Sequence, residues 1–254
     1  MNDSLIKAHL NLAAVLQNLE DLVKLDTEMA EFTRAWDRSI QFTVANGPSA
    51  YIEFQGGVCK HGLGTHPAPT IKLGFRSPEH LNDMFNGRAN PRLSFSVLRY
   101  LWFLTKRLPR LTDRLEHYLK PEEGADYDQD YRRINTTLTL LTAVHAVAVL
   151  AELEPTSKKV AAHVPDGILQ VEVLPDGPYA YLTFDNGKAV AKKGVADKSM
   201  AKMSFRNMDV ANALLSGNLD GFQAVAEGDV MLEGLIPMVD NVNLILDRIE
   251  RYLA

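Results

Sequence analysis

One short stretch of the chain holds residue types that could do chemistry. Cys59, His61 and His66 lie in the sequence CKHGLGTH. Thiolate and imidazole are zinc ligands, but a closed zinc site needs four well-placed ligands, so His80 or a carboxylate would have to complete the set. The spacing matches no recognised zinc finger. We therefore expect an exposed loop here, and a metal-dependent enzyme that uses these residues is the least favoured function.

The remaining candidates for catalysis are isolated. No serine stands in a nucleophile-elbow sequence. His145 lies in an apolar stretch typical of a core histidine, and His163 has no identified acid partner. We expect no catalytic residue, no bound metal and no cofactor, and we expect that the chain is not an enzyme.

The sequence that would form the elements around any site occurs twice in the chain. Residues 46–95 match residues 176–225 without a gap at a constant shift. The second copy has Ala189, Ala191 and Ala196 where the first has Cys59, His61 and His66, so the fold does not need those groups. The recurring residues are Gly47, Pro48, Ala50, Tyr51, Phe54, Gly57, Gly64, Lys72, Phe75, Arg76, Asn82 and Gly87, repeated as Gly177, Pro178, Ala180, Tyr181, Phe184, Gly187, Gly194, Lys202, Phe205, Arg206, Asn212 and Gly217.

The repeated unit predicts a β-meander, a further strand and a short helix. Apolar and polar residues alternate over 71–76 and 201–206, which is the period of a half-buried strand. Ser77 and Asn207 suit a helix N-cap, and Gly87 and Gly217 stand where that helix would stop. The hairpin-type dipeptides, which suit turns with positive φ, are Asn46-Gly47, Asp176-Gly177 and Asn186-Gly187.

Helices are expected on both sides of each copy. Apolar periodicity predicts them over residues 4–25, 26–38, 108–119, 131–153 and 236–253, with Pro109 marking a kink or a boundary. The apolar run within 131–153 is shorter than the roughly 20 residues of a membrane span and contains His145, so a buried helix is favoured over a transmembrane segment. Asp113, Arg114, Glu116, Tyr118 and Leu119 recur as Asp247, Arg248, Glu250, Tyr252 and Leu253.

Composition limits the classes of partner. The net charge is −5 and the basic residues are scattered, so duplex nucleic acid is not expected as a partner. Cys59 is the single cysteine, which excludes an intramolecular disulfide and fits a reducing compartment. The first four residues show no secretory signal, so we expect a cytoplasmic protein. For the following lysines a solvated face is favoured over anionic headgroups, and transient membrane contact is kept as the alternative: Lys158, Lys159, Lys192, Lys193, Lys198 and Lys202.

The second copy resembles the sterol carrier protein family of lipid-binding domains. The resemblance is carried by the Asp185-Asn186-Gly187 turn, the strand 201–206, the helix ending at Gly217, and the tail LDGF (219–222) followed by AEGDVMLEG (226–234). It covers residues 165–254 well and residues 40–119 more weakly. Residues 121–130, rich in acids, are the expected linker between units 1–120 and 131–254.

The resemblance implies an α+β fold of two units, each an antiparallel sheet with helices packed on one face. It also implies reversible, non-covalent binding of a lipid, fatty acid or acyl chain in an apolar cavity, with no set oligomeric state. The first copy lacks the Gly228-Asp229 and Glu233-Gly234 pairs, and Tyr100, Trp102 and Phe103 there could fill such a space. The candidate cavity residues are Met203, Phe205, Leu214, Leu215, Phe222, Val230, Leu232, Leu235, Val239, Val242 and Leu246. The same residues also suit an ordinary core, so a ligand-free interaction or regulatory module with filled cores is the second function considered.

Overall fold

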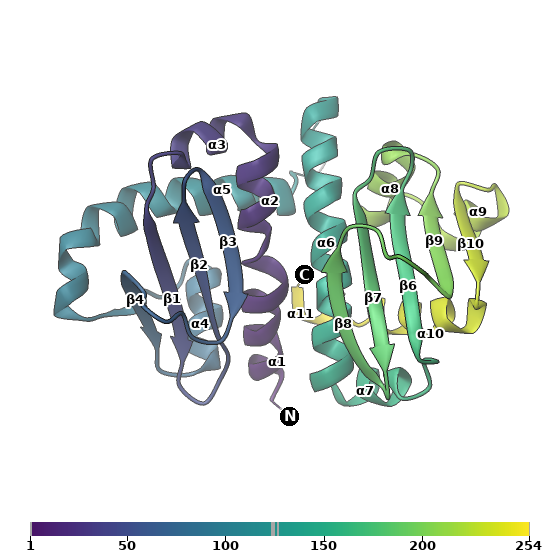
Figure 1. The fold of residues 1–254 in the computed structure, drawn as a ribbon, viewed down its shortest axis with the longest axis horizontal. Helices are drawn as coiled ribbons and strands as arrows, with labels where there is room; N and C mark the ends of the chain where they lie inside the picture. The colour runs from purple at the N-terminus through teal and green to yellow at the C-terminus, as the bar shows by residue number, and fades with distance from the viewer. Residues whose placement is uncertain (1, 123–124, 126, 254) are drawn as a thin grey trace. The chain divides into compact units, whose positions relative to one another are not determined.

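The computed structural model describes residues 2–122, 125 and 127–253. The chain divides into two compact units, residues 2–123 and 124–254, and each is described by itself (Figure 1). The division falls inside the acidic stretch expected as a linker. Below, the units are called the first unit and the second unit.

Each unit is built on one five-stranded sheet, with the same strand order in both. The order is β3-β2-β1-β4-β5 in the first unit and β8-β7-β6-β9-β10 in the second. The α+β class is confirmed, but the sheets are mixed, because β1 pairs with β4, and β6 with β9, in parallel. The strands are β1 (Arg38–Val44), β2 (Ser49–Gln55), β3 (Val58–Leu63), β4 (Ile71–Phe75), β5 (Arg92–Leu93), β6 (Gly167–Val173), β7 (Tyr179–Asp185), β8 (Lys188–Lys193), β9 (Ala201–Phe205) and β10 (Val230–Gly234).

The helices follow the predicted segments, with local differences. Those of the first unit are α1 (Asp3–Leu10), η1 (Asn11–Val15), α2 (Asn18–Leu25), α3 (Thr27–Thr33), α4 (Pro78–Phe85), η2 (Phe95–Tyr100), η3 (Phe103–Arg107) and α5 (Leu108–Leu119). Those of the second are α6 (Gln129–Leu153), α7 (Pro155–Ala161), α8 (Met208–Leu215), α9 (Gly221–Ala226), α10 (Ile236–Leu246) and α11 (Glu250–Leu253).

Two boundaries correct the sequence-based prediction, and a third agrees with it. The helix expected over 26–38 ends at Thr33, because Arg38 already belongs to β1. The closing helix expected over 236–253 is broken between α10 and α11. Pro109 marks a boundary, since it lies where the π-helical turn η3 passes into α5.

The predicted turn chemistry is confirmed by the backbone. Asn46 and Asn186 have φ values of 55° and 49°, and Gly177 and Gly187 have 90° and 73°. Asparagine and glycine adopt this left-handed region at the lowest cost, and the turns that need it reverse the chain between paired strands. Ser77 and Asn207 cap α4 and α8 by accepting hydrogen bonds from the amides of His80 and Val210.

In each unit a buried glutamine of the central strand binds the loop that crosses the sheet. Figure 1 shows helices behind the second sheet and the connection from β8 to β9 crossing in front of it. Gln170, 2% exposed, donates from Nε2 to the carbonyls of Ala180 and Gly194 and accepts from the amide of Ala196. Gln41 makes the same bonds to Ala50, Gly64 and His66. Both glutamines therefore tie the crossing loop to the central strand.

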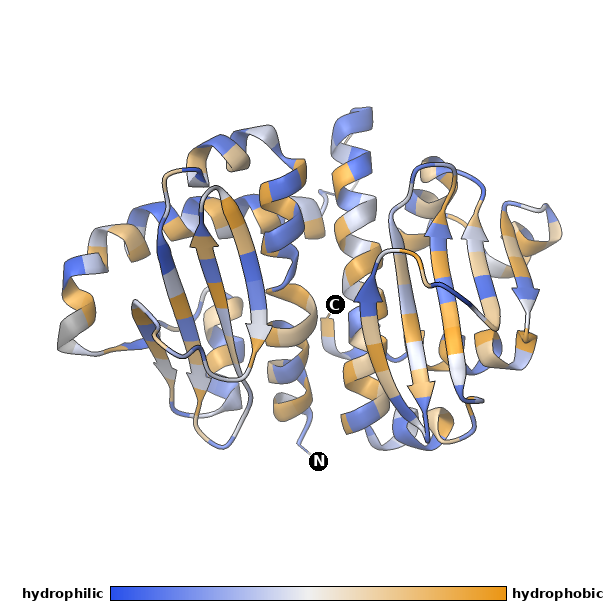
Figure 2. Cartoon of the chain, in the orientation of Figure 1, coloured by the Kyte–Doolittle hydropathy of each residue, from blue (hydrophilic) through white to orange (hydrophobic). Residues whose placement is uncertain are grey.

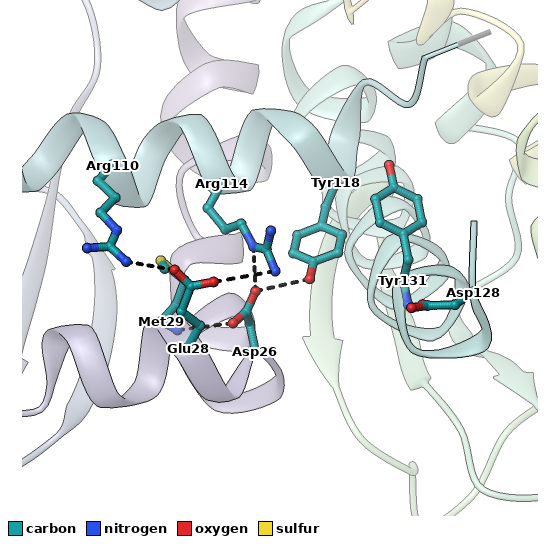
Figure 3. Close-up of polar contacts among 8 residues, drawn as sticks. All are labelled: Asp26, Glu28, Met29, Arg110, Arg114, Tyr118, Asp128 and Tyr131. Atoms are coloured by element: carbon teal, nitrogen blue, oxygen red, sulfur yellow. Dashed lines mark hydrogen bonds and ion pairs between the residues drawn. The ribbon is translucent and has the colours of Figure 1, made fainter. Parts of the chain in front are cut away.

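A buried carboxylate at a helix N-terminus holds the terminal helix of each unit. In the first unit Asp26 accepts from the Met29 amide at 3.0 Å, from Nε of Arg114 at 2.7 Å and from the Tyr118 hydroxyl at 3.0 Å (Figure 3). In the second, Glu154 accepts from the Ser157 amide at 2.6 Å and from Arg248 at 3.1 Å. The recurrence of Arg114 as Arg248 thus has a structural cause.

These contacts set the ionisation of the acids. Burial alone would raise the pKa of Asp26, but the hydrogen bonds from Arg114, Met29 and Tyr118 outweigh it and the pKa lies below its usual value. The pKa of Glu154 is lowered in the same way, by Ser157 and Arg248 against burial. Burial and the Asp26 carboxylate raise the pKa of Tyr118 to about 12.

The lowered pKa of Asp26 predicts a pH-dependent loss of stability. A folded-state pKa below the unfolded value of about 3.9 stabilises the fold above that pH, and this contribution is lost as the pH falls through the folded pKa. Replacing Asp26→Asn removes the charge but keeps a capping oxygen. We expect a loss of about 1.5–3 kcal/mol at pH 7 and a flatter pH profile below pH 4, measured by urea unfolding.

The matched control is Asp83→Asn, which removes an exposed ion pair with Arg88. Such pairs contribute about 0–1 kcal/mol, so this variant should keep the acid dependence of the parent chain. If the two variants gave the same pH profile, the buried cap would not be the source of the effect.

Candidate functional site

The predicted site residues of the second unit come from elements that meet at the edge formed by β9 and β10. The register sets Val230 opposite Phe205 and Leu232 opposite Met203, so these four side chains share one face. That face carries the buried positions of β6, including Val171 and Val173, and is the face covered by helices. Figure 1 shows α9 and β10 at one edge of this sheet.

The eleven predicted residues fall into three groups by exposure. Met203, Phe205, Val230, Val239 and Val242 are buried. Five leucines are half-buried: Leu214, Leu215, Leu232, Leu235 and Leu246. Phe222 is 89% exposed, and it lies on α9 beside the buried Ala224. The buried group belongs to the core, whereas the five leucines, here called the leucine layer, stay partly accessible.

Helix α8 is positioned by a polar contact within the unit. Nδ2 of Asn212 donates to Oδ1 of Asn135 at 2.7 Å and to Oγ1 of Thr136 at 2.9 Å. Both partners lie on α6 and are buried, so this bond sets the position of α8 against that helix. In the first unit Asn82 accepts from Asn11 and donates to the carbonyl of Ser4. The repeated Asn82 and Asn212 therefore anchor equivalent helices.

The tail motif has a structural role at the β9–β10 edge. Asp220 caps α9 by accepting from the Gln223 amide, and Gly228 ends the helix with a φ of 75°. Asp229 then binds Arg206 at 2.9 Å across the strand pair. A Cβ on Gly234 would overlap the carbonyl oxygen of Met200, so only glycine fits where β10 ends.

Helix α10 contributes the last of the predicted site residues. Its buried face carries Met238, Val239, Val242 and Ile245, at the spacing of one helical stripe. Arg248, which follows α10, binds the buried cap of α7. Leu246, on the same helix, stays half-buried. The ion pair therefore fixes the helix whose apolar side faces the predicted site.

The exposed loop expected around Cys59 and His61 is wrong, because both lie in β3 and Cys59 is buried. These two residues and His66 do not converge. Cys59 pairs with Phe54 and His61 with Ile52 in the β2–β3 register, so both belong to the side of β3 that carries the buried partners. His66 instead lies 3.5 Å from Glu53 and makes a ring contact with Tyr51, on the opposite side. Among the described residues no group of three histidines, cysteines or acids could hold a metal ion.

The first unit is filled by aromatic side chains between its helices and its sheet. Trp36, 2% exposed, packs edge-to-face on Phe54 and Phe103 with ring centroids 4.9 and 4.7 Å apart. The guanidinium of Arg38 lies 4.7 Å from the Phe103 centroid. Of the three aromatic residues expected to fill this unit, Phe103 is buried, Tyr100 is half-buried and Trp102 is 64% exposed.

Sequence reasoning missed several parts of the site. It did not find α7 and α9, which are short, although Asp220 and Gly228 flank α9 as a cap and a stop. It also missed Asn135 and Thr136, whose polar side chains lie inside the apolar α6. Helix α6 is long and apolar enough to cross a membrane by length and composition, yet 61% of its most apolar window is buried in the fold.

Comparisons with known proteins find similarity at the level of structure. No family model and no curated protein matches the chain. Among solved structures, it is similar to the ubiquinone synthesis protein "UbiJ-SCP2", with 18% identity over 42% of this chain and 95% of that one and a TM-score of 0.33. The sterol carrier protein domain 2 of Helicoverpa armigera gives 15% identity, 43% and 87% coverage, and a TM-score of 0.35.

A third similar structure is Sterol Carrier Protein 2 Like 2 from Aedes aegypti, with 12% identity, coverage of 41% of this chain and 94% of that one, and a TM-score of 0.31. The chain is thus similar in structure to sterol carrier protein 2 domains over about 42% of its length.

The β10 terminus offers a sharp test of the site geometry. Gly234 and Gly228 have nearly the same φ, 78° and 75°, but nothing lies within 4 Å of a Cβ on Gly228. Gly228→Ala should therefore cost only the left-handed strain of about 1–2 kcal/mol. Gly234→Ala adds the overlap with Met200, and we expect a loss of about 3 kcal/mol or more. Equal losses in denaturant unfolding would show that the strand end is not held as described.

Proposed function

We propose that the second unit binds a lipid or acyl chain reversibly and without catalysis. The observation that carries the proposal is the leucine layer of five half-buried residues: Leu214 and Leu215 on α8, Leu232 on β10, Leu235 directly before α10, and Leu246 on α10. Protein interiors are close-packed, and ligand sites are mostly apolar with few polar groups. Leucines that line the edge of a core, yet remain accessible, are suited to cover an apolar guest.

The resemblance of residues 165–254 to sterol carrier domains supports the same function. The residues that carry it hold the edge of the site: Gly228, Asp229 and Gly234 fix β10, and Asp220 begins α9. Phe222 on α9 is exposed beside this edge, where its ring can contact a ligand that enters or leaves the site. The motif therefore builds the mouth of the proposed site.

The first unit is proposed to have a supporting role. Trp36, Phe54 and Phe103 occupy its interior as a three-ring cluster. We assign the binding of ligand to the second unit alone.

We propose the cytoplasm as the location of the protein. The single cysteine, Cys59, is buried in the first unit and fits a protein of this reducing compartment.

A matched pair of substitutions tests the proposal. Leu214 and Met84 occupy equivalent positions of α8 and α4, and both are half-buried. Leu214→Trp should narrow the proposed site and weaken binding of a long-chain fatty acid tenfold or more, roughly the loss of two buried methylenes. Met84→Trp should leave binding unchanged. Native mass spectrometry of the intact chain, compared with denaturing conditions, gives both the occupancy and the mass of the guest.

The chain-length dependence provides a second readout. Each added methylene should strengthen binding roughly fourfold until the site is full, since burial contributes about 0.8 kcal/mol per methylene. No exchangeable lipid across several acyl classes, or equal effects of the two tryptophan variants, would instead favour the ligand-free interaction module.

A further inference from the structure

One segment of the first unit has a charge unlike the rest of the chain. Residues 84–112 contain no Asp or Glu in a chain of net charge −5. The corresponding stretch of the second unit, residues 214–246, has five carboxylates and no Lys or Arg. The cations of the first segment are Arg88, Arg92, Arg99, Lys106, Arg107 and Arg110. A concentration of one sign within a short segment indicates an oppositely charged partner.

The same segment exposes a stripe of large apolar side chains. Residues 92–107, here called the basic arm, run from β5 through η2 and η3. Leu98, Leu101 and Trp102 are 53%, 44% and 64% exposed, and their spacing of three and four residues puts them on one helical face. Val97 and Phe103, in the same segment, are buried in the unit. Figure 2 shows both hydrophobic and hydrophilic residues along this part of the chain.

The cations of the basic arm are available to a partner. Arg88 and Arg110, outside the arm, pair with Asp83 and Glu28. The four cations of the arm form no ion pair with any carboxylate in the described part of the chain: Arg92, Arg99, Lys106 and Arg107. Two of them lie over aromatic rings, with Arg99 4.7 Å from the Tyr100 centroid and Arg107 5.2 Å from that of Trp102.

We propose that the basic arm binds the surface of a bilayer that contains anionic lipids. A helix with an apolar stripe, a tryptophan and flanking cations lies in the headgroup region, where the rings and leucines enter the acyl boundary and the cations meet phosphates and carboxylates. Cationic segments are drawn to anionic leaflets, while acidic ones are repelled. The leucines, tryptophan and cations of the basic arm are the residue types expected in the headgroup region.

The small size of the stripe favours a membrane over a protein partner. A stable protein interface takes roughly 20–30 residues on each side, whereas the arm exposes three large apolar side chains in its stripe. A bilayer needs no complementary shape and adapts to a few inserted side chains. The inference is independent of the proposed ligand site, which lies in the other unit, so each can fail without the other.

The two tryptophans of the chain allow a direct measurement. Trp36 is buried and Trp102 is exposed, so Trp36→Phe leaves Trp102 as the single reporter. With phosphatidylcholine vesicles containing about 30% phosphatidylserine, Trp102 emission should shift to the blue and be quenched by brominated acyl chains. Co-sedimentation of the unaltered chain with the same vesicles gives the affinity even if Trp36→Phe destabilises the unit.

Charge-matched variants identify the surface responsible. Arg99→Gln with Lys106→Gln should weaken vesicle binding about 30-fold, since each cation near the surface contributes about a factor of five. Lys188→Gln with Lys198→Gln removes the same charge from exposed positions of the second unit and should change nothing. Leu101→Gln with Trp102→Gln tests the exposed stripe without disturbing the core.

Three results would overturn the proposal. The first is equal binding to vesicles of phosphatidylcholine alone. The second is unchanged sedimentation of both arm variants. The third is concentration-dependent self-association of the chain, lost in the arm variants and unaccompanied by vesicle binding, which would assign the stripe to a second copy.

Discussion

The terminal helix of each unit stays in place because a buried carboxylate needs a partner. Asp26 and Glu154 are both about 3% exposed and both cap a helix, and Arg114 or Arg248 supplies the charge that makes their burial tolerable. Removing the arginine would leave an uncompensated charge inside the fold. In the second unit the pair of Arg248 with Glu154 fixes the end of α10, which carries Leu246 of the leucine layer.

The two units use this shared framework for different interiors. In the first, Trp36 packs against Phe54 and Phe103, and such ring pairs stabilise beyond the area that they bury. In the second, Met203, Phe205 and Val230 belong to the core, and the five leucines of the leucine layer remain half-buried. The first unit therefore has an interior filled by aromatic rings, whereas the second keeps leucines partly accessible beside its core.

Local patterns in the sequence predicted the helices and strands, whereas contacts between residues distant in the chain could not be predicted from it. The alternation over 201–206, the caps at Ser77 and Asn207 and the stops at Gly87 and Gly217 all depend on neighbours in the chain, and all are confirmed. The parallel pairing of β1 with β4 joins strands about thirty residues apart, and no periodicity encodes it. The bond from Asn212 to Asn135 likewise joins two helices through residues that looked ordinary in sequence.

The predicted site residues show the same difference between what local periodicity predicts and what only the folded chain determines. Helical and strand periods assign a side chain to a face, and on that basis Val239, Val242 and Phe205 were placed correctly on buried faces. Periodicity does not state how completely a face is covered, so it could not separate these residues from Leu232 or from Phe222. Trp102 shows the converse case, because an aromatic expected to fill the interior lies outside it, among cations. The part of an apolar pattern that the fold leaves uncovered is therefore where interaction with a lipid is to be sought, in the leucine layer of one unit and in the basic arm of the other.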